Sequence, residues 1–128
     1  MSGVVADTSV WIDFFAGRPA GTLEDALAQG VVVLPPLVVA ELISGARRPR
    51  DRVAIFDLIQ ELPLHETPLD HWVRVGGLRR ELLGRGVSVS TPDAHVAQCA
   101  LDRGAILLSR DAVFARIARV TTLQLRST

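Results

Sequence analysis

Short apolar runs rich in β-branched residues alternate along the chain with longer segments in which apolar residues recur at helical spacing. The apolar runs predict strands at residues 4–6, 31–34, 64–67, 105–108 and 121–125. The helical spacing, together with capping residues, predicts helices at 10–15, 21–29, 35–44, 51–61, 68–84, 90–103 and 111–118. Alternation of this kind predicts an α/β fold with a central, mostly parallel β-sheet flanked by helices on both faces.

The length and the apolar content fit one compact domain over residues 1–128, of which 48% are hydrophobic and 22% are charged. The longest apolar stretch, residues 31–40, is interrupted by Pro35 and Pro36 and is too short to cross a membrane. The first residues carry no basic and apolar signal-peptide pattern. The single cysteine, Cys99, excludes an internal disulfide framework and a zinc site built from cysteines. We therefore expect a cytoplasmic protein that makes no contact with membranes.

All 14 basic side chains are arginines, and the 14 acidic residues balance them to a formal charge of zero. The absence of lysine excludes P-loop enzymes, Schiff-base chemistry and receiver-type phosphoacceptor domains. A balanced charge means that any binding of nucleic acid depends on a local arginine patch. The densest run of arginines is formed by Arg47, Arg48, Arg50 and Arg52. These side chains either contact RNA phosphates or simply stabilise a solvated helix end.

Four acidic residues stand out by their positions: three lie where helices or strands begin or end, and the fourth lies inside a helix. Asp7 follows the first predicted strand, and Asp111 comes shortly after the strand at 105–108. Asp93 lies in the first turn of a helix, and Glu41 lies within an otherwise apolar helix. Each aspartate could merely cap a helix or favour its dipole. Carboxylates gathered at one edge would repel one another without a cation, so the joint pattern favours a Mg²⁺ or Mn²⁺ site.

At these acidic positions the chain resembles the PIN domain family, and within it the small bacterial VapC-type toxins. Four blocks carry the resemblance in family order over essentially the whole chain: VADTSVWIDF at 5–14, VAELISG at 39–45, TPDAHVA at 91–97 and LLSRD at 107–111. The family often has Thr-x-Asp-x-Asp-Phe in its last block. Here Ser109 replaces the threonine and Val113 the second acid, while Phe114 is kept.

The resemblance implies a Mg²⁺-dependent endoribonuclease, with Mn²⁺ as the alternative ion, that acts as the toxin of a toxin–antitoxin pair. It implies that the catalytic and metal-binding residues are Asp7, Glu41, Asp93 and Asp111. It places Ser9, Ser109 and Arg110 beside the RNA substrate, and it implies products with 5′-phosphate and 3′-hydroxyl ends. The RNA target and the number of metal ions stay open.

The same resemblance implies a small VapB-type antitoxin protein as partner and a homodimer as the assembly. Trp11 and Phe15 are expected to be exposed apolar side chains near the acidic cleft, where the antitoxin would bind. An arginine of the antitoxin could then make bidentate hydrogen bonds to the carboxylates.

Two other functions compete with a nuclease. A non-catalytic PIN-like module that binds RNA or protein would be favoured if a principal acid were lost, but all four are present. An acid-cluster phosphatase would need an Asp-x-Asp pair or a lysine, and the chain has neither. The remaining metal-binding residue types are expected to be structural. The spacing of His65, His71 and His95 matches no metal cluster, and Cys99 lies in an apolar helix as a small buried side chain.

Overall fold

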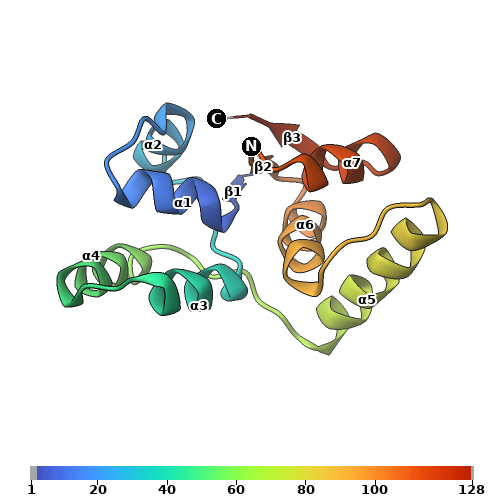
Figure 1. The fold of residues 1–128 in the computed structure, drawn as a ribbon, viewed down its shortest axis with the longest axis horizontal. Helices are drawn as coiled ribbons and strands as arrows, with labels where there is room; N and C mark the ends of the chain where they lie inside the picture. The colour runs from blue at the N-terminus through green and yellow to red at the C-terminus, as the bar shows by residue number, and fades with distance from the viewer. Residues whose placement is uncertain (1–2, 128) are drawn as a thin grey trace.

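The computed structural model describes residues 3–127 and contains helices and strands in nearly the predicted order (Figure 1). In chain order they are β1 (Val4–Ala6), α1 (Thr8–Phe15), α2 (Gly21–Ala28), α3 (Pro36–Gly45), α4 (Pro49–Ile59), α5 (Leu69–Gly84), α6 (Thr91–Arg103), β2 (Ile106–Leu108), α7 (Ala112–Val120) and β3 (Gln124–Arg126). Capping residues and helical periodicity therefore predicted the helices well, because both depend on residues that are close together in the sequence.

The sheet is parallel, and its three strands are ordered β1, β2, β3. Two predicted strands, 31–34 and 64–67, are present only as isolated bridges, in which Val32 pairs with Val4 and Leu34 pairs with Leu64. The prediction of full strands there was wrong. Val32 and Leu34 pair with different neighbours, and helix α3 begins two residues after Leu34, which leaves no room for a longer ladder.

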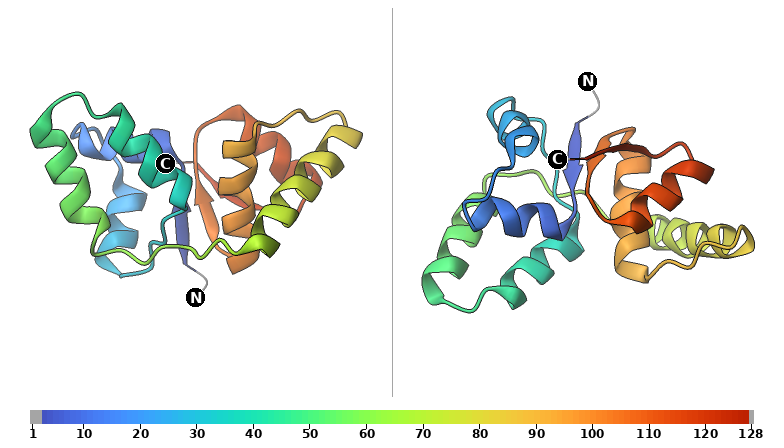
Figure 2. Two further views of the ribbon diagram at one scale, coloured as in Figure 1. Left: turned by 90° about the horizontal axis from the view of Figure 1, so that it is seen from below. Right: turned by 45° about the horizontal axis from the view of Figure 1, so that its top comes forward.

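The helices cover both sides of the sheet. In Figure 2, α1 to α4 gather on one side of the strands and α5 to α7 on the other. The buried core joins the two sides and includes Val5, Trp11, Leu107, Phe114 and Ile117. The predicted α/β architecture is therefore confirmed. None of the helices in residues 3–127 is both long and apolar enough to cross a lipid bilayer.

The last predicted strand starts later than expected, at Gln124 instead of residue 121. Thr121 instead ends helix α7. Its hydroxyl donates to the carbonyl of Ile117 at 2.8 Å and accepts from the backbone N–H of Leu123 at 3.2 Å. A threonine between a helix and a strand can belong to either element. Here its hydroxyl pairs with backbone groups that have no partner within the helix at its C-terminal end.

Candidate functional site

Asp7 lies at the carboxyl end of β1 and caps α1, so the capping and the functional interpretations apply to the same side chain. Its Oδ1 accepts from the backbone N–H of Val10 at 3.1 Å and from the Ser9 hydroxyl at 2.7 Å. Its Oδ2 accepts from the Ser109 hydroxyl. Asp7 is only 6% exposed, and these hydrogen bonds compensate for the burial of its carboxylate. The carboxylate is therefore held in one orientation.

The parallel pairing of β1 with β2 places the second acidic segment beside the first. The backbone N–H of Asp7 donates to the carbonyl of Leu108 at 3.1 Å, and Ser109 follows directly. The Ser109 hydroxyl accepts from the backbone N–H of Asp111 at 3.0 Å. Asp111 is exposed and caps α7, accepting from the backbone N–H of Val113 at 3.0 Å. The Ser109 hydroxyl thus connects the Asp7 carboxylate to the backbone of Asp111.

Asp93, in the first turn of α6, lies close enough to the other three acids for their charges to act on it. Burial is the main cause that raises the pKa of Asp93, and the hydrogen bond to Ser90 opposes that effect. The negative charges of three further carboxylates, those of Asp111, Asp7 and Glu41, raise this pKa again. The fold therefore gathers Asp93 with the other three acids that the sequence singled out.

Glu41 reaches the cluster from α3 and is exposed. Its Oε1 accepts from the hydroxyl of Thr8, the first residue of α1, at 2.6 Å. Four carboxylates with mutual repulsion fit a hard divalent cation such as Mg²⁺, which prefers oxygen ligands. The residues that could hold such an ion are Asp7, Glu41, Asp93 and Asp111.

Arg110, which the resemblance places beside the substrate, is engaged in an ion pair. Its guanidinium donates to Asp13 on α1, which also accepts from Arg18 at 2.7 Å. The Arg110 side chain is about half exposed. Contact with RNA would therefore compete with Asp13. This pairing joins residues far apart in the sequence, so no local pattern indicated it.

A groove of about 580 Å³ begins at Glu41 and runs between α1, α3 and α4. Its apolar lining includes Ile12, Phe15 and Leu42, and arginines of the 47–50 segment stand at its edge. The expectation that Trp11 is exposed near this region was wrong. Trp11 is fully buried, where it packs on Phe15 with ring centroids 6.0 Å apart. Ile12, on the next position of the helix, is 51% exposed and faces the groove instead.

The arginine run therefore divides into two kinds of residue. Arg47, Arg48 and Arg50 line the groove. Arg52 instead donates to the carbonyl of Ala46 at 3.0 Å and also to that of Arg47, and thereby closes the end of α3. The helix-end interpretation holds for Arg52, because unpaired carbonyls at a helix C-terminus attract cations.

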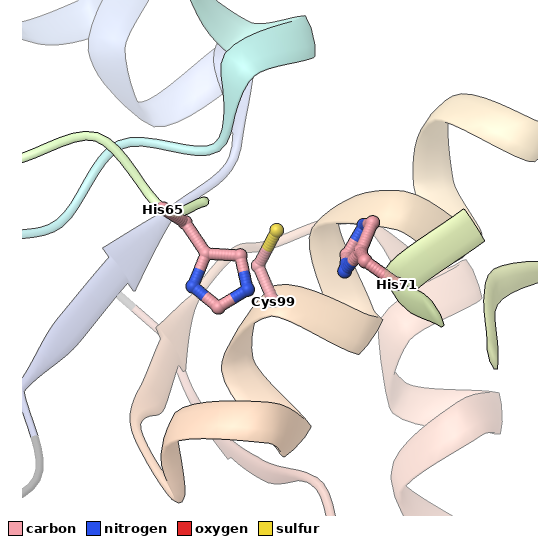
Figure 3. Close-up of side chains that lie close together, drawn as sticks. All are labelled: His65, His71 and Cys99. Atoms are coloured by element: carbon pink, nitrogen blue, oxygen red, sulfur yellow. The ribbon is translucent and has the colours of Figure 1, made fainter. Parts of the chain in front are cut away.

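Sequence reasoning missed a second gathering of polar side chains, at the interface of α5 and α6. His65, His71 and Cys99 lie together there (Figure 3). One feature of the sequence could have indicated this group. His95, Cys99 and Asp102 are spaced i, i+4 and i+7, which puts them on one face of α6. His71 joins this face through the packing of α5 on α6, and His65 joins it from the segment before α5.

Comparison with known proteins agrees with this geometry. The sequence model of the PIN domain matches residues 4–120. VapC ribonuclease Mb1587 of Mycobacterium bovis is 29% identical over 132 residues, covering 97% of this chain and 98% of that protein. Among solved structures, DNA-bound VapBC from Salmonella typhimurium superposes with a TM-score of 0.80 at 21% identity, covering 99% of this chain and 98% of the other. VapBC-5 from Mycobacterium tuberculosis has a TM-score of 0.71 at 20% identity, covering all of both chains.

The family model covers most of the chain, and the fold of the solved structures extends over nearly all of it. Nucleases of this family depend on divalent metal ions, and the donor set of four carboxylates fits that requirement. By the match of the family model to residues 4–120, with which its fold agrees, this chain belongs to the PIN domain family.

Proposed function

We propose that this protein is a Mg²⁺-dependent endoribonuclease and the toxin of a toxin–antitoxin pair. The observation that carries the proposal is the placement of Asp7 and Asp111, joined through Ser109, beside the carboxyl ends of the paired strands β1 and β2. The name of the Mycobacterium bovis relative, VapC ribonuclease, supports RNA as the substrate. RNA as substrate makes the cytoplasm the proposed place of action.

The proposed chemistry divides roles among the four acids. A bound Mg²⁺ would lower the pKa of a water molecule and neutralise charge on the scissile phosphodiester. Asp7, Asp93 and Asp111 would hold the ion, and Asp7 is already oriented by three hydrogen bonds. Glu41 is exposed and would act as a further ligand or accept the proton of the attacking water.

Two serines support this site in different ways. Ser109 orients the Asp7 carboxylate through its hydroxyl, which also accepts from the backbone N–H of Asp111. Ser9 is exposed beside Asp7, which leaves it able to approach a substrate phosphate. Attack by water would leave 5′-phosphate and 3′-hydroxyl ends, since the bond broken is the one to the 3′ oxygen.

Cleavage of total RNA by the purified protein in Mg²⁺ tests this proposal. We expect a limited set of fragments, whose 5′ ends can be ligated directly because they carry phosphate. Mapping the ends identifies the cleavage sequence. Binding of RNA without any cleavage, under conditions where the protein is folded, would favour the non-catalytic binding module instead.

We propose that a VapB-type antitoxin occupies the groove between α1, α3 and α4. The solved relatives from Salmonella typhimurium and Mycobacterium tuberculosis are VapBC toxin–antitoxin systems. The groove offers an apolar lining for a partner segment, and Glu41 at its end offers a carboxylate for a partner arginine. Glu41 suits that contact better than Asp7, whose oxygens already accept three hydrogen bonds.

Replacing Ile12 by arginine is expected to weaken antitoxin binding by at least about tenfold while RNA cleavage is retained. Ile12 is exposed, so the change places a charge in the groove without disturbing the core. The measurement is titration calorimetry with the antitoxin encoded beside the toxin. Val53→Arg is the matched control, since Val53 is exposed to a similar extent, 58% against 51% for Ile12, but does not line the groove. Equal affinity of both variants would place the antitoxin elsewhere.

We also propose that the protein forms a homodimer. Helix α5 carries exposed apolar side chains, among them Leu69 and Val73, at 77% and 66% exposure. Burying such residues against a second copy is favourable, and a row of them on one helix is unusual for a monomer.

A further inference from the structure

A second group of metal-ligand residue types lies in the interior, outside the acidic site. One ligand atom each from His65, His71 and Cys99 lies within 4.8 Å of the others. All three residues are buried, and so is the neighbouring His95. Figure 3 shows His65 coming from the segment before α5, His71 from the first turn of α5 and Cys99 from α6. The group therefore joins three separate segments of the chain.

Asp102, one turn beyond Cys99 on α6, adds a carboxylate to this group. Its Oδ2 lies 3.3 Å from His71 Nδ1 and 3.7 Å from His65 Nε2. Arg74 donates to both of its oxygens, at 3.0 and 2.9 Å, and Gln98 donates at 2.8 Å. Burial opposes ionisation, but the hydrogen bonds from Arg74, Gln98 and His71 lower the pKa of Asp102 to about 2. Asp102 is therefore a carboxylate.

Without a metal, the hydrogen bonds assign a proton to each of the other groups. His71 Nδ1–H donates to Asp102, so His71 Nε2 accepts from His95 Nδ1–H at 2.7 Å. His95 Nε2 then accepts from the Cys99 thiol, with 3.8 Å between nitrogen and sulfur. Burial lowers the pKa of His95 to about 4 and raises that of Cys99 to about 12. The histidine is neutral, and the thiol keeps its proton.

We propose that His65, His71 and Cys99, with Asp102 as the fourth donor, form a second metal site that takes Zn²⁺. Two nitrogens, one sulfur and one oxygen make a donor set typical of tetrahedral zinc. Bond lengths of about 2.0–2.3 Å to such an ion separate the ligands by about 3.3–3.8 Å. The donors of His65, His71 and Cys99, which lie within 4.8 Å of one another, need to close by up to about 1.5 Å.

Zinc binding releases one proton, and the chain of hydrogen bonds accounts for it. The Cys99 thiol gives its proton to His95 Nε2 as the sulfur–zinc bond forms. His95 Nδ1 passes its proton to His71 Nε2, and His71 Nδ1 loses its proton to solvent and binds the ion. In the bound form, His71 Nε2–H donates to His95 and His95 Nε2–H donates to the thiolate. This keeps the buried polar atoms paired and orients the ligands from outside.

The charges of the site also suit a divalent ion. One thiolate and one carboxylate neutralise Zn²⁺, and the bidentate hydrogen bonds of Arg74 hold Asp102 in place. Arg103 approaches His65 Nδ1 at 3.4 Å and opposes a cation there, but it is exposed and can turn toward solvent. Soft sulfur and imidazole donors select zinc over magnesium, whereas the four acids select magnesium. The two sites therefore differ in the ion that they take.

Cobalt substitution tests this proposal, because a thiolate bound to Co²⁺ gives a charge-transfer absorption band that carboxylates do not give. Cys99 is the only cysteine of the chain, so the band can be assigned without ambiguity. The full-length protein, freed of metal, is titrated with Co²⁺ in excess Mg²⁺, which occupies the acidic site. We expect the band to saturate at one Co²⁺ per chain and to disappear when one equivalent of Zn²⁺ is added.

Two variants make the test specific. Cys99→Ser should abolish the band and weaken Zn²⁺ binding by at least about 100-fold, since loss of an outer hydrogen-bond partner alone costs about 10–100-fold. RNA cleavage by Cys99→Ser should be unchanged, because Cys99 lies outside the acidic site. Asp111→Asn should retain the band in full. Zn²⁺ should also raise the melting temperature of the wild-type chain but not that of Cys99→Ser.

The absence of a thiolate band with Co²⁺ would overturn the proposal, and so would equal Zn²⁺ affinity of the wild-type protein and Cys99→Ser. Either result would make the group a hydrogen-bonded network that stabilises the packing of α5 on α6. Since these readouts need no RNA, they are independent of the proposed ribonuclease activity.

Discussion

Asp93→Asn is expected to lower the rate of RNA cleavage by at least about 10³-fold, because losing the ion that stabilises the transition state removes several kcal/mol. The amide keeps the shape of the side chain but not the charge that attracts Mg²⁺. The same change should raise the melting temperature of the metal-free protein. Burial and three neighbouring carboxylates disfavour the ionised form of Asp93, as its raised pKa shows. The measurements are a gel-based cleavage assay and a thermal melt in chelator.

Asp7→Asn provides the contrast, since the two carboxylates differ in their surroundings. It should abolish cleavage equally but lower the melting temperature, because an amide nitrogen cannot accept the hydrogen bonds that one Asp7 oxygen accepts. Asp25→Asn, on the exposed side of α2, should change neither property. Full activity in Asp93→Asn would show that cleavage does not need this carboxylate, and unfolding of that variant would indicate a structural role for it.

Removal of divalent metal with excess EDTA is expected to stop RNA cleavage entirely, and addition of Mg²⁺ or Mn²⁺ should restore it. Four negative carboxylates cannot neutralise the charge that develops on the phosphodiester without a cation, and the chain has no lysine to do so. Metal-free protein should remain folded, because the apolar core does not depend on the acidic edge.

The chelation experiment must distinguish the two metal sites, since EDTA also binds Zn²⁺. Mg²⁺ alone should restore cleavage in both the wild-type protein and Cys99→Ser. Cleavage that persists in EDTA, in a preparation whose Asp93→Asn variant is inactive, would mean that the acids act without a metal.

Several features of the acidic site could be predicted because they depend on neighbouring residues in the chain. A carboxylate after a strand and before a helix, as at Asp7 and Asp111, is indicated by capping and by the order of elements. Parallel strands then bring such positions to one edge. The positions of Glu41 and Asp93 suggested two further members, the family resemblance implied the same four acids, and the charges of the other three raise the pKa of Asp93.

Other features escaped prediction because they depend on which surfaces meet. The sequence places the apolar residues Trp11 and Phe15 on one predicted helix, but only the packing of α1 decides which of them is buried in the core. Apolar runs predict extended segments, but only the neighbours of Val32 and Leu34 decide whether a ladder continues.

The sequence by itself determined the order of helices and strands, the helix caps and the acids placed beside them, because each rests on the periodicity or capping of adjacent residues. Only the tertiary structure decided that Arg110 pairs with Asp13, that a groove leads to Glu41, and that His65 and His71 meet Cys99. These contacts join segments that no local pattern relates. They arise when apolar faces bury one another, and the polar side chains carried on those faces are then paired by the packing.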